Sequence, residues 1–320
     1  MPEKLFPIVD ISYLSNNFED SAQWKDNIQF QNDLKIKQLA QELRAGFETW
    51  GFLYIKGHNI PGNLVNNVFG QSKTFFDRPY DHKSKYPRGE GIGEGWLGSE
   101  NEVFDPSLPR DMKEAFDFRP NTEIPDKLSK DMPNLVGGMT ELFDHCTELS
   151  LKFLRLLAVA LDIDTEKYAA SHSNMGRCEK NGTSLRSLYY PAIKDTVITD
   201  KDRRCREHTD YGTITLLFQD EVGGLEVLSP TGEFVKAVPI PGSIVINAGD
   251  MLKDWSHGQY KATIHRVVTS TDQNKCTIAR QSMAFFCHPN FDIDIGENEE
   301  KINVFDHISK RFNETIIPTN

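Results

Sequence analysis

The residue types best suited to chemistry in this chain of 320 residues are two histidines and an aspartate, at His208, Asp210 and His265. On an extended strand, residues i and i+2 point to the same face, so His208 and Asp210 can bind one cation together. A second histidine would complete the two-histidine, one-carboxylate arrangement of non-haem Fe(II) sites. Zinc accepts the same ligands, and a lone His-x-Asp pattern also arises by chance, so this spacing alone does not choose the metal.

A second pair, Arg280 and Ser282, forms the only Arg-x-Ser in the chain. The two side chains share one face of a strand, and a guanidinium inside an apolar barrel is costly unless it meets an anion. A carboxylate matches the guanidinium fork through two parallel hydrogen bonds. The pair therefore predicts either a site for a carboxylate ligand or a structural ion pair with Asp or Glu. Zinc chemistry does not require such an anchor.

These residues lie in a part of the chain that consists of short β-rich runs separated by turn residues. His265 stands on an alternating apolar run, where a histidine is an odd choice for core packing. The basic run 201–206 is interpreted as a solvated loop. The succession of runs predicts an antiparallel sandwich or barrel of the jelly-roll kind. The runs cover residues 185–190, 213–218, 224–228, 233–238, 243–247, 262–268 and 277–287.

The first half of the chain is predicted to be mostly helical. Apolar residues at a spacing of three to four predict amphipathic helices over 31–50 and 134–161, and a further helix is expected over 62–77. Short strands are expected over 7–11 and 51–55. The helices must pack on the outside of the barrel to bury their apolar faces.

The fold class that follows is α+β, a jelly-roll barrel with N-terminal and flanking helices. We expect one domain over residues 1–320. Residues 1–180 form its mostly helical part, 181–290 form the jelly-roll core with the metal site, and 291–320 form a C-terminal helix or tail.

Composition and charge narrow the classes of partner. The formal net charge is −11, which disfavours binding to nucleic acid through a basic surface. No apolar stretch has the length of a membrane span, and no secretory signal is recognised. The five cysteines form no CxxC pattern, which fits a reducing compartment. We expect a cytoplasmic monomer that acts on a small molecule, without nucleic acid or membrane partners.

Several motifs together resemble the isopenicillin N synthase-like branch of the 2-oxoglutarate/Fe(II)-dependent oxygenases. The resemblance extends along most of the chain. The motifs are PIVDIS at 7–12, the GF and GFLYI block at 46–61, KEAFDF at 113–118, LRSLYYP at 185–191, HTDYGTITLL at 208–217, GGLEV at 223–227, PGSIVINAGD at 241–250 and TIHRV at 263–267.

The resemblance implies a double-stranded β-helix fold with Fe(II), 2-oxoglutarate and O2 as cofactor and cosubstrates. It implies His208, Asp210 and His265 as the iron ligands. It further implies Arg280, Ser282 and Tyr190 as the residues that hold the distal carboxylate of 2-oxoglutarate. One position departs from the family pattern, because many plant members have Asn where this chain has Leu188.

The implied reaction is the oxidation of an unactivated C–H bond of a small organic molecule, by hydroxylation, desaturation or ring closure, with release of succinate and CO2. Two alternatives stay open: an oxidase of the same fold that does not use 2-oxoglutarate, and a non-catalytic metal-binding barrel. Trp96, Glu100 and Phe286 are candidate substrate contacts. The glycine-rich segment 88–99 has five glycines in twelve positions, and no regular structure is expected there. It is interpreted either as a lid that closes over the pocket with Trp96 or as a rigid loop that Trp96 anchors to the barrel.

Overall fold

The chain is described here from a computed structural model. The structure describes residues 6–18, 27–99, 102, 111–193, 203–269, 277–296 and 301–315.

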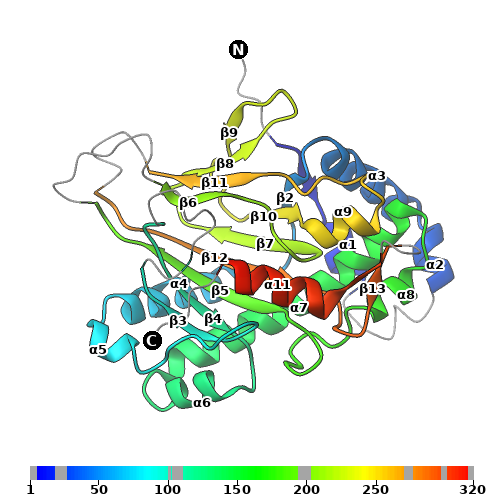
Figure 1. The fold of residues 1–320 in the computed structure, drawn as a ribbon. Helices are drawn as coiled ribbons and strands as arrows, with labels where there is room; N and C mark the ends of the chain where they lie inside the picture. The colour runs from blue at the N-terminus through cyan, green and yellow to red at the C-terminus, as the bar shows by residue number, and fades with distance from the viewer. Residues whose placement is uncertain are drawn as a thin grey trace.

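Two facing sheets form a double-stranded β-helix (Figure 1). All the β-rich runs predicted between residues 185 and 287 are strands. The large sheet has eight strands, in the order β1 (Ile8–Asp10), β2 (Phe52–Lys56), β10 (Ile244–Ala248), β7 (Ile214–Gln219), β12 (Arg280–Cys287), β5 (Ser184–Tyr190), β4 (Glu114–Phe118) and β3 (Gly95–Leu97). The small sheet has four, in the order β6 (Arg203–His208), β11 (His265–Val268), β8 (Leu225–Leu228) and β9 (Phe234–Lys236).

Strand β12 shows how the alternation of side chains divides the molecule into two apolar regions. Met283, Phe285 and Cys287 pack in one apolar cluster with the helices. Ala284 and Phe286 point the other way, into the space between the sheets. Because side chains alternate along a strand, the same strand seals the helical core with one face and lines the cavity with the other.

Helix α7 (Pro133–Leu161) is the centre of the helical layer, and it packs against α3 (Leu34–Thr49), α4 (Gly62–Phe76) and the large sheet. The three long helices predicted from apolar spacing are confirmed, each within a few residues of its predicted bounds. The shorter helices are α1 (Ser12–Asn17), α2 (Asn27–Asn32), α5 (Tyr80–Lys83), α6 (Glu123–Ser129), α8 (Thr165–Ala170) and α9 (Asp250–Trp255). Within the described parts of the chain, no helix combines the length and the apolar character needed to cross a membrane.

The C-terminal helix α11 (Val304–Thr315) follows a short hairpin of β13 (Asp294–Ile295) and β14 (Ile302–Asn303). Val304 and Ile308 bury its apolar side in a small cluster with Met251 and Ile295. Figure 1 shows this helix in red, crossing the view of the large sheet. The helix thereby packs beside the barrel.

Two expectations for local structure were wrong. The basic run at 201–206 is not a solvated loop, because strand β6 begins at Arg203 and buries Arg204, Cys205 and Arg206. Partners make this burial possible: Arg204 Nη2 donates to the carbonyl of Ile278 at 3.0 Å. The glycine-rich segment also contains regular structure, since β3 pairs antiparallel with β4.

Candidate active site

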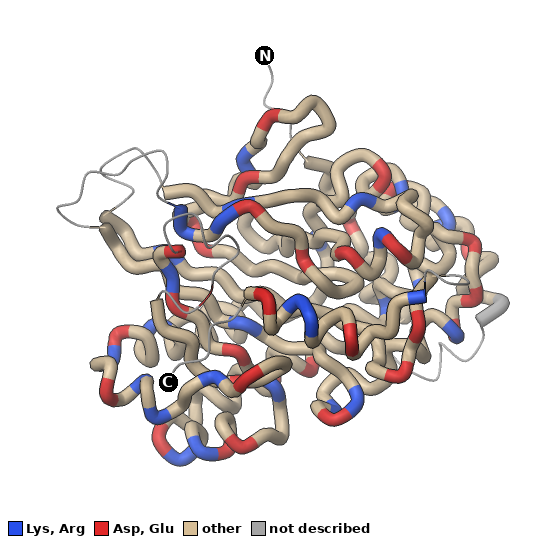
Figure 2. The backbone as a smooth tube through the Cα atoms, in the orientation of Figure 1, with Lys and Arg blue, Asp and Glu red and all other residues tan. Residues whose placement is uncertain are grey.

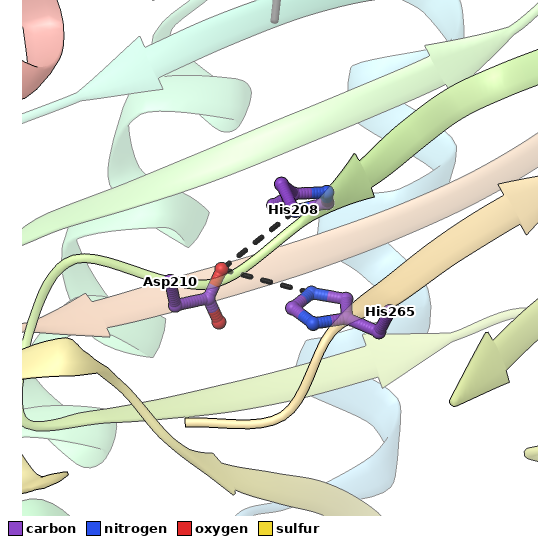
Figure 3. Close-up of side chains that lie close together, drawn as sticks. All are labelled: His208, Asp210 and His265. Carbon is purple, nitrogen blue, oxygen red and sulfur yellow. Dashed lines mark ion pairs between the residues drawn. The ribbon is translucent and has the colours of Figure 1, made fainter. Parts of the chain in front are cut away.

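Strand pairing brings His208 and His265 together although they lie far apart in the sequence. They are direct cross-strand partners in the antiparallel pair of β6 and β11, and their ring centroids are 4.3 Å apart. Asp210 lies just beyond β6 on the same side, with Oδ1 3.8 Å from His208 Nε2 and 3.7 Å from His265 Nε2 (Figure 3). The three candidate ligand atoms lie within 4.8 Å of one another, close enough to share one metal ion.

Backbone carbonyls orient both imidazoles. His208 Nδ1 donates to the carbonyl of Arg206 at 2.7 Å, and His265 Nδ1 donates to the carbonyl of Thr263 at 3.1 Å. A carbonyl can only accept, so Nδ1 carries the proton and Nε2 presents its lone pair toward Asp210. The donor set of two imidazole nitrogens and one carboxylate oxygen, with an open side, fits a ferrous ion.

The electrostatics also favour metal binding, because metal ligands must be deprotonated. Burial, with His208 next to it, lowers the pKa of His265 to about 4. Burial alone would raise the pKa of Asp210, but the two imidazoles and hydrogen bonds from Asn247 and Thr215 hold that pKa below its usual value. Near neutral pH, His265 is therefore neutral and Asp210 is ionised.

A cavity of ≈ 100 Å³ opens beside these three residues, and Arg280, Ser282 and Tyr190 line one end of it. Arg280 is the largest fully buried side chain among the described residues. Its Nη1 donates to Ser282 Oγ at 3.0 Å, and its guanidinium lies 4.8 Å from the centre of the Tyr190 ring. We call this the anion end of the cavity.

Arg280 has no ion-pair partner in the described parts of the chain, and its Nε is buried without a hydrogen-bond partner. The neighbouring carboxylate of Asp220 accepts hydrogen bonds from the backbone amides of Gln281 and Val222 instead. The structural ion pair considered from the sequence is therefore not found among these residues. A buried guanidinium without an anion fits a carboxylate ligand such as that of 2-oxoglutarate.

Leu188, the departure from the family pattern, is the cross-strand partner of Ser282 and lines the cavity. An isobutyl side chain has no hydrogen-bonding group, so it contributes an apolar surface where many plant members place an amide.

The opposite end of the cavity, which we call the substrate end, is lined by the aromatic residues Phe286, Tyr211 and Phe312. Phe312 comes from α11, and its ring lies 5.0 Å from the Arg88 guanidinium. Tyr211 Oη donates to Thr315 Oγ1 of the same helix at 3.3 Å. The C-terminal helix thus forms part of the wall.

Polar groups also reach the substrate end. His288 is buried, lines the cavity, and forms no ring hydrogen bond within the described chain; its Nδ1 is enclosed without a partner. Arg186 is held by Asp117 and by Glu102, whose Oε1 accepts from Arg186 Nη1 at 2.8 Å. These residues can therefore offer a substrate hydrogen bonds.

Sequence reasoning selected the three candidate metal ligands and the residues of the anion end, and all six line one cavity in the structure. It missed most of the substrate end. Tyr211 lies inside the HTDYGTITLL motif and was identifiable from it. No local signal marked Phe312. His288 follows Cys287 at a strand end, and this pair by itself gave too little reason to assign His288 to a site. Phe286, which the sequence did select, lines the cavity.

Trp96, which was also selected as a substrate contact, lies away from the cavity. It is buried in β3, its Nε1 donates to Glu114 Oε2 at 2.7 Å, and it is not among the residues that line the cavity. Glu100 lies outside the described residues. The structure also argues against the lid interpretation, because the Arg88 side chain ties the glycine-rich segment to β4 through Asp117 at 2.7 Å. The same guanidinium donates to the carbonyls of Gly89 and Gly91 and so holds the segment's own backbone in place. Trp96 therefore serves as an anchor of this segment.

Comparison with known proteins defines the class. Residues 182–289 match the 2OG-Fe(II) oxygenase superfamily, and residues 6–137 match the family described as non-haem dioxygenase in morphine synthesis N-terminal. The chain belongs to the 2OG-Fe(II) oxygenase superfamily.

Individual relatives cover nearly the whole chain. A homoarginine-6-hydroxylase of Oryza sativa subsp. japonica is 34% identical over 90% of this chain and 87% of its own length. A full-length Neurospora crassa protein, in a crystal structure with alpha-KG (2-oxoglutarate), is 32% identical with a TM-score of 0.80 and 98% coverage of both chains. A further structure of the Neurospora crassa protein contains alpha-KG and thymine, at 30% identity and a TM-score of 0.78, with 98% of both chains covered.

These findings confirm the predicted class. The protein is an oxidoreductase, a dioxygenase that depends on Fe(II) and 2-oxoglutarate and uses O2.

Proposed function

We propose that His208, Asp210 and His265 hold the ferrous ion and that Arg280, Ser282 and Tyr190 bind the distal carboxylate of 2-oxoglutarate. The observation that carries this proposal is the buried Arg280 without an anion, at the end of the same cavity that the three candidate ligands line. The substrate then occupies the other end, against Phe286, Tyr211 and Phe312.

Iron and 2-oxoglutarate, when bound, supply the oxidation of a C–H bond by O2 with release of succinate and CO2. The chain supplies the orientation. Arg280 and Ser282 hold the cosubstrate by its far carboxylate, so that its other end points toward the ligand triad. The aromatic walls contributed by Phe286 and Phe312 exclude water from the reacting carbon and hold it in place.

The charges around the cavity support a substrate without a positive charge. Among the described lining residues, the cations are Arg186, Lys113 and Arg280, and the anions are Glu102 and Asp210. Both oxygens of Glu102 are engaged, by Lys113 at 2.7 Å and by Arg186 at 2.8 Å. Asp210 faces the metal position. A guanidinium or ammonium group would therefore find no free carboxylate among these residues.

We accordingly propose a small, uncharged or anionic substrate with a planar portion that packs on the aromatic walls and a group that hydrogen-bonds to His288. Thymine, which the Neurospora crassa protein binds in its crystal structure, has this character, whereas homoarginine carries a guanidinium. The relatives thus provide two probes of opposite charge type.

The remaining expectations from the sequence belong to the same proposal: a single domain over residues 1–320, a monomer, a cytoplasmic location, and no nucleic acid or membrane partner. Figure 2 supports the absence of a nucleic acid partner, because basic and acidic residues are interspersed along the described chain. The net charge of −11 has the sign opposite to that of a phosphate-binding surface.

The test is a turnover assay with the Fe(II)-loaded protein, in which O2 consumption and succinate are measured with and without 2-oxoglutarate. A panel of small molecules that includes thymine and L-homoarginine is added to each reaction. We expect O2 consumption to require 2-oxoglutarate and to be stimulated by uncharged or anionic compounds of the panel. Turnover without 2-oxoglutarate would favour the oxidase alternative, and strong stimulation by homoarginine would contradict the proposed substrate class.

A further inference from the structure

Asp210 uses its two carboxylate oxygens differently. Oδ1 faces the Nε2 atoms of both histidines, whereas Oδ2 points away from them into the large sheet. There Oδ2 accepts a hydrogen bond from Thr215 Oγ1 at 2.5 Å and another from Asn247 Nδ2 at 2.7 Å. Both donors are buried, with 4% and 2% of their surface exposed. The two donors therefore engage the oxygen that does not face the metal position.

The two donors form a unit built by strand pairing. Thr215 on β7 and Asn247 on β10 are direct cross-strand partners, so their side chains share the face that looks into the cavity. The backbone of Asp210 is held near the end of β10 as well, because the amide of Asp250 donates to the Asp210 carbonyl at 2.8 Å. Asp210 lies on a loop, but its side chain and main chain are both held by residues at this edge of the sheet.

From this geometry we propose that Thr215 and Asn247 are positioning residues that fix Asp210 as a one-oxygen metal ligand. With Oδ2 held by two donors, the carboxylate cannot rotate to bind the metal through both oxygens. A second Asp210 oxygen on the metal would occupy a position that the cosubstrate or O2 needs. This inference rests on the proposed metal site. It means that two residues of the large sheet orient Asp210, which follows strand β6 of the small sheet.

Isosteric replacements test the proposal. Thr215→Val removes the hydroxyl but keeps the shape, Thr215→Ser keeps the hydroxyl, and Asn247→Leu removes the amide donor. The readout is the dissociation constant for Mn(II), added as a probe to the metal-free protein, together with the Mn(II)-dependent shift in thermal unfolding. Outer-shell partners of metal ligands are worth about 10- to 100-fold in metal affinity. We expect Thr215→Val and Asn247→Leu each to weaken Mn(II) binding by about tenfold or more, and Thr215→Ser to stay within about threefold of the unchanged protein.

Asp210→Ala is measured alongside as the reference for loss of the ligand itself. If Asp210→Ala weakens Mn(II) binding but Thr215→Val and Asn247→Leu do not, the positioning role is wrong and the metal site stands. If Asp210→Ala leaves Mn(II) binding unchanged, the proposed metal site itself fails. If Asn247→Leu does not fold, Thr215→Val against Thr215→Ser decides, because these changes alter one or two atoms.

Discussion

The two ends of the cavity are built in different ways. At the anion end, Arg280 and Tyr190 are direct cross-strand partners on β12 and β5, and Ser282 follows two positions along the same strand. At the substrate end, Phe286 lies further along β12, Phe312 lies on helix α11 and Tyr211 lies in a loop after β6. One end depends on a single strand pair, whereas the other depends on three separate segments that meet only in the folded chain.

If the proposed roles hold, this difference separates the residues that bind the cosubstrate from those that select the substrate. A strand pair holds its side chains at spacings set by the backbone, so the anion end is rigid and suited to one ligand. Loops and a terminal helix carry side chains that can change without disturbing the barrel, so the substrate end can differ between relatives of the same fold. Separate losses of cosubstrate binding and of substrate binding in variants of the two ends would support this division.

The proposed metal ligands line the same cavity as both ends, and their loss should stop turnover altogether. We expect His208→Ala, Asp210→Ala or His265→Ala to abolish succinate formation while circular dichroism shows an intact fold, because each removes one of only three protein ligands. Near-normal turnover in any two of these variants would show that the iron assignment is wrong.

At the anion end, Arg280→Ala should raise the KM for 2-oxoglutarate by at least about 30-fold, since breaking a desolvated charge pair costs about 2–5 kcal/mol. Arg280→Lys keeps the positive charge but loses the planar guanidinium that can donate two parallel hydrogen bonds. Its KM for 2-oxoglutarate should lie between those of the unchanged protein and of Arg280→Ala. Initial rates at varied 2-oxoglutarate provide the measurement. A raised KM for the main substrate with an unchanged KM for 2-oxoglutarate would instead mean that Arg280 belongs to the substrate end.

Acid should destabilise the fold through the buried His172. Burial lowers the pKa of His172 from 6.5 to about 4, and its Nε2 is 2.8 Å from Thr213 Oγ1. Below pH 6.5 the unfolded chain binds a proton at His172 more readily than the folded chain does. The free energy of unfolding is therefore undiminished above pH 6.5 and falls as the pH drops toward 4, by about 3 kcal/mol for this group.

Urea unfolding of the metal-free protein at pH 7 and at pH 4.5 measures this effect. The His172→Gln variant, which keeps a hydrogen-bonding side chain of similar reach, should lose less stability on acidification than the unchanged protein. An identical loss in both proteins would show that other buried groups account for the pH dependence.

At the substrate end, Phe312→Ala should raise the KM for the main substrate about tenfold. Full burial of a phenylalanine side chain contributes about 1.5–3 kcal/mol of free energy, and the half-buried Phe312 ring contributes only part of this. The ratio of succinate to product should also rise as water enters. Phe305→Ala provides the matched control, since Phe305 lies on the same helix and is 47% exposed. A raised KM for 2-oxoglutarate in Phe312→Ala would contradict the separation of the two ends.

The smallest effect is expected in the glycine-rich segment. The amide of Arg88 donates to the Trp96 carbonyl at 2.8 Å, and the amide of Trp96 donates to the Tyr86 carbonyl at 2.6 Å. These amides should exchange slowly with deuterium in the free protein and change little when 2-oxoglutarate and substrate bind. Fast exchange that slows on binding would restore the lid interpretation.

The strands of the barrel and the long helices could be predicted from the sequence, and so could the candidate residues of the metal site and of the anion end. These features repeat at spacings of two or of three to four residues, and such periods reflect the geometry of the backbone. A His-x-Asp and an Arg-x-Ser therefore show which side chains share a face before any tertiary structure is known.

The contacts that each of these side chains makes could not be predicted from the sequence and are seen first in the folded structure. It placed Trp96 against Glu114, buried Arg204 and Arg206 in a strand, brought Phe312 to the cavity, and joined Thr215 to Asn247 behind Asp210. Each of these outcomes depends on contacts between segments far apart in the chain. The physical reason is that a local period specifies the direction of a side chain, while its partners are set by how distant elements pack.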